Sequence, residues 1–197
     1  YPDFDALESK IGPGTRIVLI NSPNNPTGVV YSTEILNRLG DLIRSKEAEY
    51  GTEIFLVSDE PYRKIMFDEA EYPHVFPHHI RSIVATSHSK DLALPGERIG
   101  IVAISPEYTR RDELMNGLTF CNRTLGFVNA PALMQYIVRH LQSATIEVGQ
   151  YQAKRDFLYD QLVKIGYSIV KPQGAFYMFP KSPIEDDIAL VDMLREH

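Results

Sequence analysis

Residues 16–28 read RIVLINSPNNPTG, an apolar run that ends in a cluster of turn-forming residues. β-Branched side chains dominate the run and favour a buried strand, which the Asn, Pro and Gly residues then end. Further apolar runs occur at 54–58, 82–87 and 99–104, and a helical pattern with Leu36, Leu39 and Ile43 on one face follows the first. Strands that are apolar on both faces and alternate with helices indicate a three-layer αβα domain with a mostly parallel sheet.

The pattern changes after Pro106. Helical periodicity predicts helices over about 107–120, 129–143 and 146–165. Two short strands, 167–170 and 175–179, are expected to flank a Pro-Gln-Gly turn, and a last helix is expected from Asp186. A hairpin followed by a helix indicates the start of a smaller α+β domain. We therefore predict a partial large domain over 1–143 and a partial small domain over 144–197.

Composition excludes several classes of protein. The 197 residues carry 20 Lys and Arg against 26 Asp and Glu, so the net charge of −6 disfavours nucleic acid and anionic membranes as partners. No apolar run reaches the roughly 18–20 residues that a membrane span needs. The single cysteine, Cys121, cannot form an internal disulfide and suits a reducing compartment such as the cytoplasm. The chain begins with Tyr and ends within a helical pattern, so we expect a fragment of a longer protein.

Polar residues follow each of the predicted strands. Residues 21–28 follow the first strand, residues 59–62 the second and residues 87–90 the third, while Arg98 precedes the fourth. Ligands of open α/β sheets bind at the carboxyl ends of the strands, so one shared site is expected there. Lys90 would be a nucleophile toward carbonyl groups, and Arg98 with nearby hydroxyls would suit a phosphate.

Each of these features also has an ordinary structural interpretation. The Asn-Pro-Thr-Gly stretch at 25–28 suits a simple turn, and a lysine is by default a solvated surface residue. His74, His78 and His79 lie close together, but the spacing of a metal site is missing around them. We interpret them as loop histidines and predict no metal.

Three motifs in order carry a resemblance to a known family. They are Asn-Pro-Thr-Gly at 25–28, Asp-x-x-Tyr at 59–62, and Ser-x-x-Lys-x7-Arg-x-Gly at 87–100. Together they resemble the fold type I, pyridoxal-phosphate-dependent aminotransferases of the class I and II group. Weaker agreement at 151–156 and 174–177 extends the resemblance over essentially the whole chain.

The resemblance implies a role for each matching residue. Lys90 matches the lysine that forms a Schiff base with pyridoxal 5′-phosphate and moves protons during catalysis. Asp59 matches the carboxylate that keeps the pyridine nitrogen of the cofactor protonated, so that the ring accepts electrons. Tyr62 and Asn25 match the two groups that hydrogen-bond the 3′ oxygen of the cofactor.

The remaining matches concern the phosphate of the cofactor. Ser87 and Arg98 match its ligands, a hydroxyl and a bidentate guanidinium, and Ser89 is a further candidate. The glycine-rich phosphate loop, the aromatic ring stacked on the cofactor and the arginine that binds the substrate carboxylate would lie outside this chain. We therefore expect the chain to be inactive on its own.

The resulting hypothesis is an aminotransferase that moves an amino group from an amino acid to a 2-oxo acid. The family resemblance implies a homodimer, and from the composition we expect a cytoplasmic location. A carbon–sulfur lyase on the same scaffold, or a non-catalytic cofactor-binding fragment, remains an alternative. A general phosphate-binding domain is disfavoured because neither a GxxxxGK[ST] nor a GxGxxG motif occurs. The sequence leaves the amino acid and the 2-oxo acid open.

Overall fold

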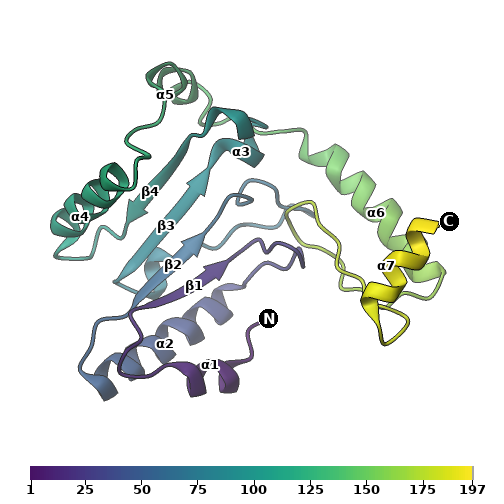
Figure 1. The fold of residues 1–197 in the computed structure, drawn as a ribbon, viewed down its shortest axis with the longest axis horizontal. Helices are drawn as coiled ribbons and strands as arrows, with labels where there is room; N and C mark the ends of the chain where they lie inside the picture. The colour runs from purple at the N-terminus through teal and green to yellow at the C-terminus, as the bar shows by residue number, and fades with distance from the viewer. Residues whose placement is uncertain (197) are drawn as a thin grey trace.

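A mostly parallel sheet forms the centre of the large, N-terminal part of the chain. In the computed structural model, which describes residues 1–196, the sheet has four strands in the order β1-β2-β3-β4 (Figure 1). The strands are β1 (Ile17–Asn21), β2 (Phe55–Asp59), β3 (Ser82–Ser87) and β4 (Gly100–Ile104). The first three are parallel, and β4 pairs with β3 in the antiparallel direction. The predicted mostly parallel α/β architecture is confirmed.

Seven α-helices accompany the sheet within residues 1–196. They are α1 (Phe4–Lys10), α2 (Thr33–Tyr50), α3 (His88–Asp91), α4 (Arg111–Thr124), α5 (Ala132–Arg139), α6 (Val148–Lys164) and α7 (Asp187–Glu196). The longest, α2, begins where the Ser32 hydroxyl accepts a hydrogen bond from the Ile35 amide, and it ends at Gly51 with a φ of 62°. None of the helices in this described part of the chain is long and apolar enough to cross a membrane.

The hydrophobic core lies between α2 and one face of the sheet. The α2 side chains that the sequence pattern places on one face, Leu36, Leu39 and Ile43, are all buried. They pack with alternate residues of the strands, and these are Val18, Ile20, Leu56 and Val84. Side chains of a strand alternate between its two faces, so this set defines the covered face of the sheet.

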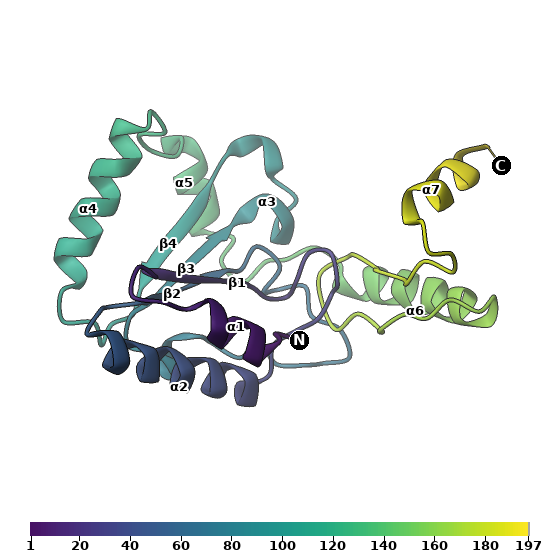
Figure 2. The ribbon, with the colours of Figure 1, turned by 60° about the horizontal axis from the view of Figure 1, so that its bottom comes forward.

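The other face of β1 and part of β4 are exposed, which corrects the expectation of strands buried on both faces. Ile17 and Leu19 are 59% and 67% exposed, and Val102 is 47% exposed. The reason is the placement of the helices: α1 and α2 lie on one side of the sheet, whereas α4 and α5 lie beyond β4 on the other (Figure 2). No helix within residues 1–196 covers the free face of β1.

The prediction of strands at 167–170 and 175–179 is wrong, because neither segment forms a strand. A strand needs a ladder of hydrogen bonds to a neighbour, and these segments have only isolated ones. Gly174 forms a single antiparallel bridge with Met66, and the Lys181 amide donates to the Ser168 carbonyl at 2.8 Å. The division into domains at residue 143 stays a prediction.

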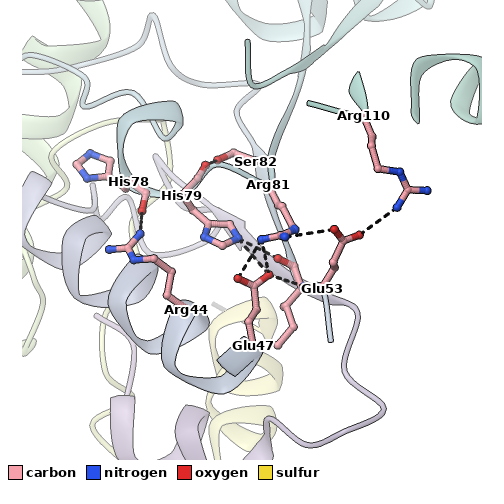
Figure 3. Close-up of polar contacts among 9 residues, drawn as sticks. Arg44, Glu47, Glu53, His78, His79, Arg81, Ser82 and Arg110 are labelled. Atoms are coloured by element: carbon pink, nitrogen blue, oxygen red, sulfur yellow. Dashed lines mark hydrogen bonds and ion pairs between the residues drawn. The ribbon is translucent and has the colours of Figure 1, made fainter. Parts of the chain in front are cut away.

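A cluster of charged groups links α2 to the beginnings of β2 and β3 (Figure 3). Arg81 pairs with Glu47 and with Glu53, each at 3.2 Å. The ring of His79 is buried and lies 2.9 Å from the Ile54 carbonyl oxygen, and burial lowers its pKa. A buried neutral histidine bonded to the backbone has a structural role. Among the described residues, no group of three or more His, Cys, Asp or Glu is arranged to hold a metal ion.

Two helical glycines give a matched test of how closely α2 packs against the segment that carries His78. A Cβ on Gly40 in α2 would collide with the carbonyl oxygen of His78, whereas a Cβ on Gly117 in α4 would meet nothing within 4 Å. We expect Gly117→Ala to stabilise the protein by up to about 1 kcal/mol through helix propensity. Gly40→Ala should instead destabilise it by about 1–3 kcal/mol, since overpacking outweighs that gain. Urea unfolding measures both, and equal effects would contradict the packing described here.

Candidate active site

The carboxyl ends of β1 and β2 bring three polar residues together through Asn21. The register pairs Asn21 directly with Asp59. The side-chain amide nitrogen of Asn21 donates to the main-chain oxygen of Asp59 at 3.0 Å and to the Asp59 carboxylate at 3.3 Å. The Asn21 side-chain oxygen accepts from the Asn25 amide at 2.8 Å. Asn21 therefore fixes both the carboxylate and the turn at 25–28, although the sequence motifs do not include it.

Asp59 lies on the uncovered face of the sheet. It is exposed, while the neighbouring Ser58 and Glu60 are buried. Partial burial raises the pKa of the Asp59 carboxyl, and the hydrogen bond from Asn21 opposes this shift. The carboxylate is thus held by a neutral amide on a face that a ligand can reach, and its charge is available to a cationic group.

Tyr62 is the most buried of the predicted site residues, with only 3% of its surface exposed. Its hydroxyl oxygen lies 2.8 Å from that of Tyr177. Burial, followed by the hydrogen bond to Tyr177, raises the pKa of the Tyr62 phenol, while a hydrogen bond with the Asn25 side chain lowers it. The phenol therefore keeps its proton at neutral pH and can donate it in a hydrogen bond.

Lys90 lies in α3, the short helix that follows β3. Its Nζ atom is 5.8 Å from the centre of the Phe176 ring. The same ring packs edge-on against Tyr62, with 5.4 Å between the ring centres. The helix is anchored from within, since His88 Nδ1 lies 3.2 Å from the Asp91 carboxylate and both residues are buried. The amine and the phenol thus share one aromatic neighbour.

The three predicted phosphate ligands lie around the β3–β4 connection. Ser87 is the last residue of β3 and pairs with Gly100, while Ser89 is half-buried in α3. Arg98 is exposed and has a φ of 49°. Its guanidinium donates to the Pro95 carbonyl at 2.8 Å and lines an open cavity of about 800 Å³. Within residues 1–196, no hydrogen bond joins Arg98 to either serine, and the role of these three residues as phosphate ligands stays a prediction.

Residues 172–177, here called the 172–177 segment, hold two loops of the site together. The Gln173 and Gly174 amides donate to the Gly28 carbonyl at 2.8 and 3.1 Å. The Ala175 amide donates to the Ile65 carbonyl at 2.9 Å. The segment therefore joins the turn that carries Asn25 to the loop that carries Tyr62.

Glycine is required at two of these contacts. Gly28 has a φ of 68°, and a Cβ on it would lie 2.5 Å from the Pro172 Cβ. A Cβ on Gly174 would lie 2.8 Å from the Ile65 carbonyl oxygen. The backbones approach too closely for a side chain, which explains the glycine in each position.

Arg155 of α6 secures the 172–177 segment from the other side. Its buried guanidinium donates to the Pro172 carbonyl at 2.9 Å and to the Asp68 carboxylate at 2.7 and 2.8 Å. The hydrogen bonds from Arg155 lower the pKa of the Asp68 carboxyl. With the further bond from Arg155 Nε to the Asp156 carboxylate at 3.0 Å, these contacts occupy all three nitrogens of the planar guanidinium.

Sequence reasoning did not single out Asn21, Tyr177 or Phe176 as site residues. Asn21 carried one signal, since it is the polar residue that ends an apolar strand. Tyr177 and Phe176 could be found only through the tertiary contact between the 172–177 segment and the loop after β2. The site as a whole offers an amine, a carboxylate, a neutral phenol and an amide within one region.

Comparisons with known proteins identify what the chain is similar to. The sequence profile of the family described as aminotransferase class I and II matches residues 1–197. The chain is 33% identical to a probable aspartate aminotransferase of Methanocaldococcus jannaschii, over 90% of this chain and 46% of that protein. It is 30% identical to the glutamate-pyruvate aminotransferase AlaA of Escherichia coli, over 92% of this chain and 45% of that protein.

Solved structures show the same similarity. An amino transferase from Eubacterium rectale superimposes with a TM-score of 0.96 at 45% identity, covering 98% of this chain and 49% of that one. An aspartate aminotransferase from Thermotoga maritima gives a TM-score of 0.80 at 27% identity, covering 100% and 50%. The chain spans at most half the length of each of these four relatives.

The raised pKa of Asp59 predicts a stability that depends on pH. The folded pKa lies above the ordinary value of 3.8, so the unfolded chain loses its proton first and ionisation of Asp59 disfavours the folded state. We expect Asp59→Asn to raise the melting temperature of the cofactor-free protein at pH 7. The gain should shrink as pH falls through the folded pKa, and it should vanish below pH 3.8. A lower melting temperature of Asp59→Asn at pH 7 would contradict this assignment.

Proposed function

The chain belongs to the aminotransferase class I and II family, and on that premise we propose that it forms part of a pyridoxal-phosphate-dependent aminotransferase. The reaction would move an amino group from an amino acid to a 2-oxo acid. One observation carries the proposal: the structure gathers Asn25, Asp59, Tyr62 and Lys90 around the carboxyl ends of β1–β3. All four belong to the three sequence motifs.

The donor set fits pyridoxal 5′-phosphate. When bound, this cofactor supplies an electron-accepting ring that stabilises the charge left after a proton leaves the α carbon of the amino acid. Asp59 would hold the ring nitrogen and its proton, because its carboxylate lies on the free face of the sheet and is held by a neutral amide. Lys90 would hold the cofactor covalently through Nζ and would move a proton at that nitrogen.

The neutral phenol of Tyr62 and the amide of Asn25 would bind the ring oxygen of the cofactor. Both are hydrogen-bond donors, and the raised pKa of Tyr62 keeps its proton in place. Ser87, Ser89 and Arg98 would bind the phosphate. Arg98 is exposed and bonded to a single carbonyl, so its guanidinium can exchange that bond for a bidentate contact with phosphate.

A homodimer in the cytoplasm completes the proposal. Apolar side chains of α4, α5 and their connection are exposed, and the most exposed are Phe120, Leu125, Phe127, Leu133 and Tyr136. An apolar surface of this kind supports association with a second subunit. The one cysteine, Cys121, is exposed and free, which is compatible with a reducing compartment.

Lys90→Ala tests the proposal in the whole protein. Borohydride reduction in the presence of pyridoxal phosphate should attach the cofactor to Lys90 in the wild type, as located by mass spectrometry. The variant should lose this adduct, and its transamination rate should fall at least about 100-fold because the proton-transferring amine is missing. Lys164→Ala, which removes an exposed lysine at the end of α6, serves as the control and should behave like the wild type.

Turnover of Lys90→Ala near the wild-type rate, or labelling of surface lysines alone, would refute the assignment. Steady release of pyruvate and ammonia from cystathionine, with no 2-oxo acid present, would instead identify the carbon–sulfur lyase. Reduction followed by mass spectrometry therefore tests the site. Whether turnover requires a 2-oxo acid tests the reaction.

A further inference from the structure

Tyr177 lies outside the three motifs, yet its hydroxyl is 2.8 Å from that of Tyr62, 115 positions away in the sequence. We propose that Tyr177 is a positioning residue, whose hydroxyl holds that of Tyr62 in the orientation in which Tyr62 donates a hydrogen bond to the cofactor. This inference rests on the proposed function and names a residue that acts through another one. Tyr177 itself is not assigned a contact with substrate or cofactor.

The rings around Tyr62 leave one degree of freedom for Tyr177 to control. Phe176 and Tyr177 both pack edge-on against the Tyr62 ring, with 5.4 and 5.5 Å between ring centres. The ring of Tyr62 is buried and fixed by these contacts. What remains is rotation of the hydroxyl proton about the bond between the ring and the oxygen. The hydrogen-bond partners of the oxygen, the Tyr177 hydroxyl and the Asn25 side chain, decide where that proton points.

Two phenols in contact can form a chain of hydrogen bonds that runs from Tyr177 to Tyr62 and on to a further acceptor. Each hydroxyl has one proton to donate and two lone pairs that accept. When Tyr177 donates to the Tyr62 oxygen, the Tyr62 proton is turned away from Tyr177 and is free for a second acceptor. A donated hydrogen bond also polarises the O–H that accepts it, which strengthens the next bond in the chain. Burial raises the pKa of Tyr62, so the phenol stays protonated and has a proton to donate.

The hydroxyl of Tyr177 is not needed to dock the 172–177 segment. Backbone bonds from the Ala175 amide to the Ile65 carbonyl and from the Phe67 amide to the Gln173 carbonyl, at 2.9 and 3.0 Å, already hold it. The aromatic ring of residue 177 would also remain in Tyr177→Phe. This variant therefore removes one hydroxyl from an otherwise intact contact, and it separates positioning from folding.

The test uses the whole protein and four variants: Tyr177→Phe, Tyr62→Phe, the double variant, and Tyr151→Phe as the control. Tyr151 belongs to the same aromatic cluster through Phe176, at 5.6 Å between ring centres, but lies outside the Tyr62–Tyr177 hydroxyl pair. In cofactor-free protein labelled with ¹³C-tyrosine, the Cζ resonance of Tyr62 is assigned by its loss in Tyr62→Phe. It should move in Tyr177→Phe and stay in place in Tyr151→Phe.

Binding of pyridoxal phosphate provides the second readout. Tyr177→Phe should weaken it about fivefold, the effect of one neutral hydrogen bond. In the Tyr62→Phe background the same substitution should have no further effect, because Tyr177 acts through Tyr62. The pH at which the bound cofactor changes its absorbance should also rise in Tyr177→Phe, since the hydrogen bond from Tyr62 that lowers this pH becomes weaker.

Three results would overturn the inference: an unmoved Tyr62 resonance, unchanged cofactor affinity in Tyr177→Phe, or an equal loss of affinity in the Tyr62→Phe background. Should Tyr177→Phe fail to fold, the wild type still decides, since the Tyr177 hydroxyl proton, which is donated to the Tyr62 oxygen, must then exchange slowly with solvent in the cofactor-free protein. Rapid exchange contradicts positioning. A wild type that binds no pyridoxal phosphate refutes the proposed function, while the resonance comparison still tests the link between the two tyrosines.

Discussion

The carbonyl oxygen of Gly28 accepts hydrogen bonds from the Gln173 and Gly174 amides, and much of the site depends on this contact. The turn at 25–28 and the loop after β2 are remote from the 172–177 segment in the sequence, so tertiary packing alone brings them together. The contact is possible only because glycine stands at positions 28 and 174, where a Cβ would collide with Pro172 or with the Ile65 carbonyl. Arg155 then holds Pro172 from the opposite side.

The same contact explains how groups of different chemistry come to share one region. Asp59 is placed by the register of two parallel strands and by Asn21, so its position is a property of the sheet. Tyr62 instead packs against Phe176 and Tyr177, which the docked segment supplies, and Phe176 also lies near the Lys90 amine. The Asp59 carboxylate is thus fixed by the large, N-terminal part of the chain. The Tyr62 phenol and the Lys90 amine share Phe176, a neighbour from the C-terminal part. Any movement of the 172–177 segment would change the surroundings of Tyr62 and Lys90 and leave Asp59 in place.

Local sequence patterns predict much of this structure, and their failures have physical causes. The four strands and α2 were predicted because β-branched runs and a capped amphipathic helix are local signals. The segments at 167–170 and 175–179 carry the same apolar signal, but a strand also needs a partner, which a local pattern cannot supply. Exposure of Ile17 and Leu19 likewise depends on which helices cover the sheet. The motifs select Asn25, Asp59, Tyr62 and Lys90, whereas the contacts made by Asn21 and Tyr177 are defined by the fold.

Hydrogen exchange of the backbone amides that dock the 172–177 segment tests this account most directly. If docking is one cooperative event, the amides of Phe67, Gly174 and Ala175 open together in the wild type. In Arg155→Met, which removes charged hydrogen bonds, all three should exchange about 10- to 100-fold faster by a common factor. Amides in the middle of α2 should keep their protection. Separate rates for the three amides, or unchanged protection in Arg155→Met, would contradict a site held together by this contact.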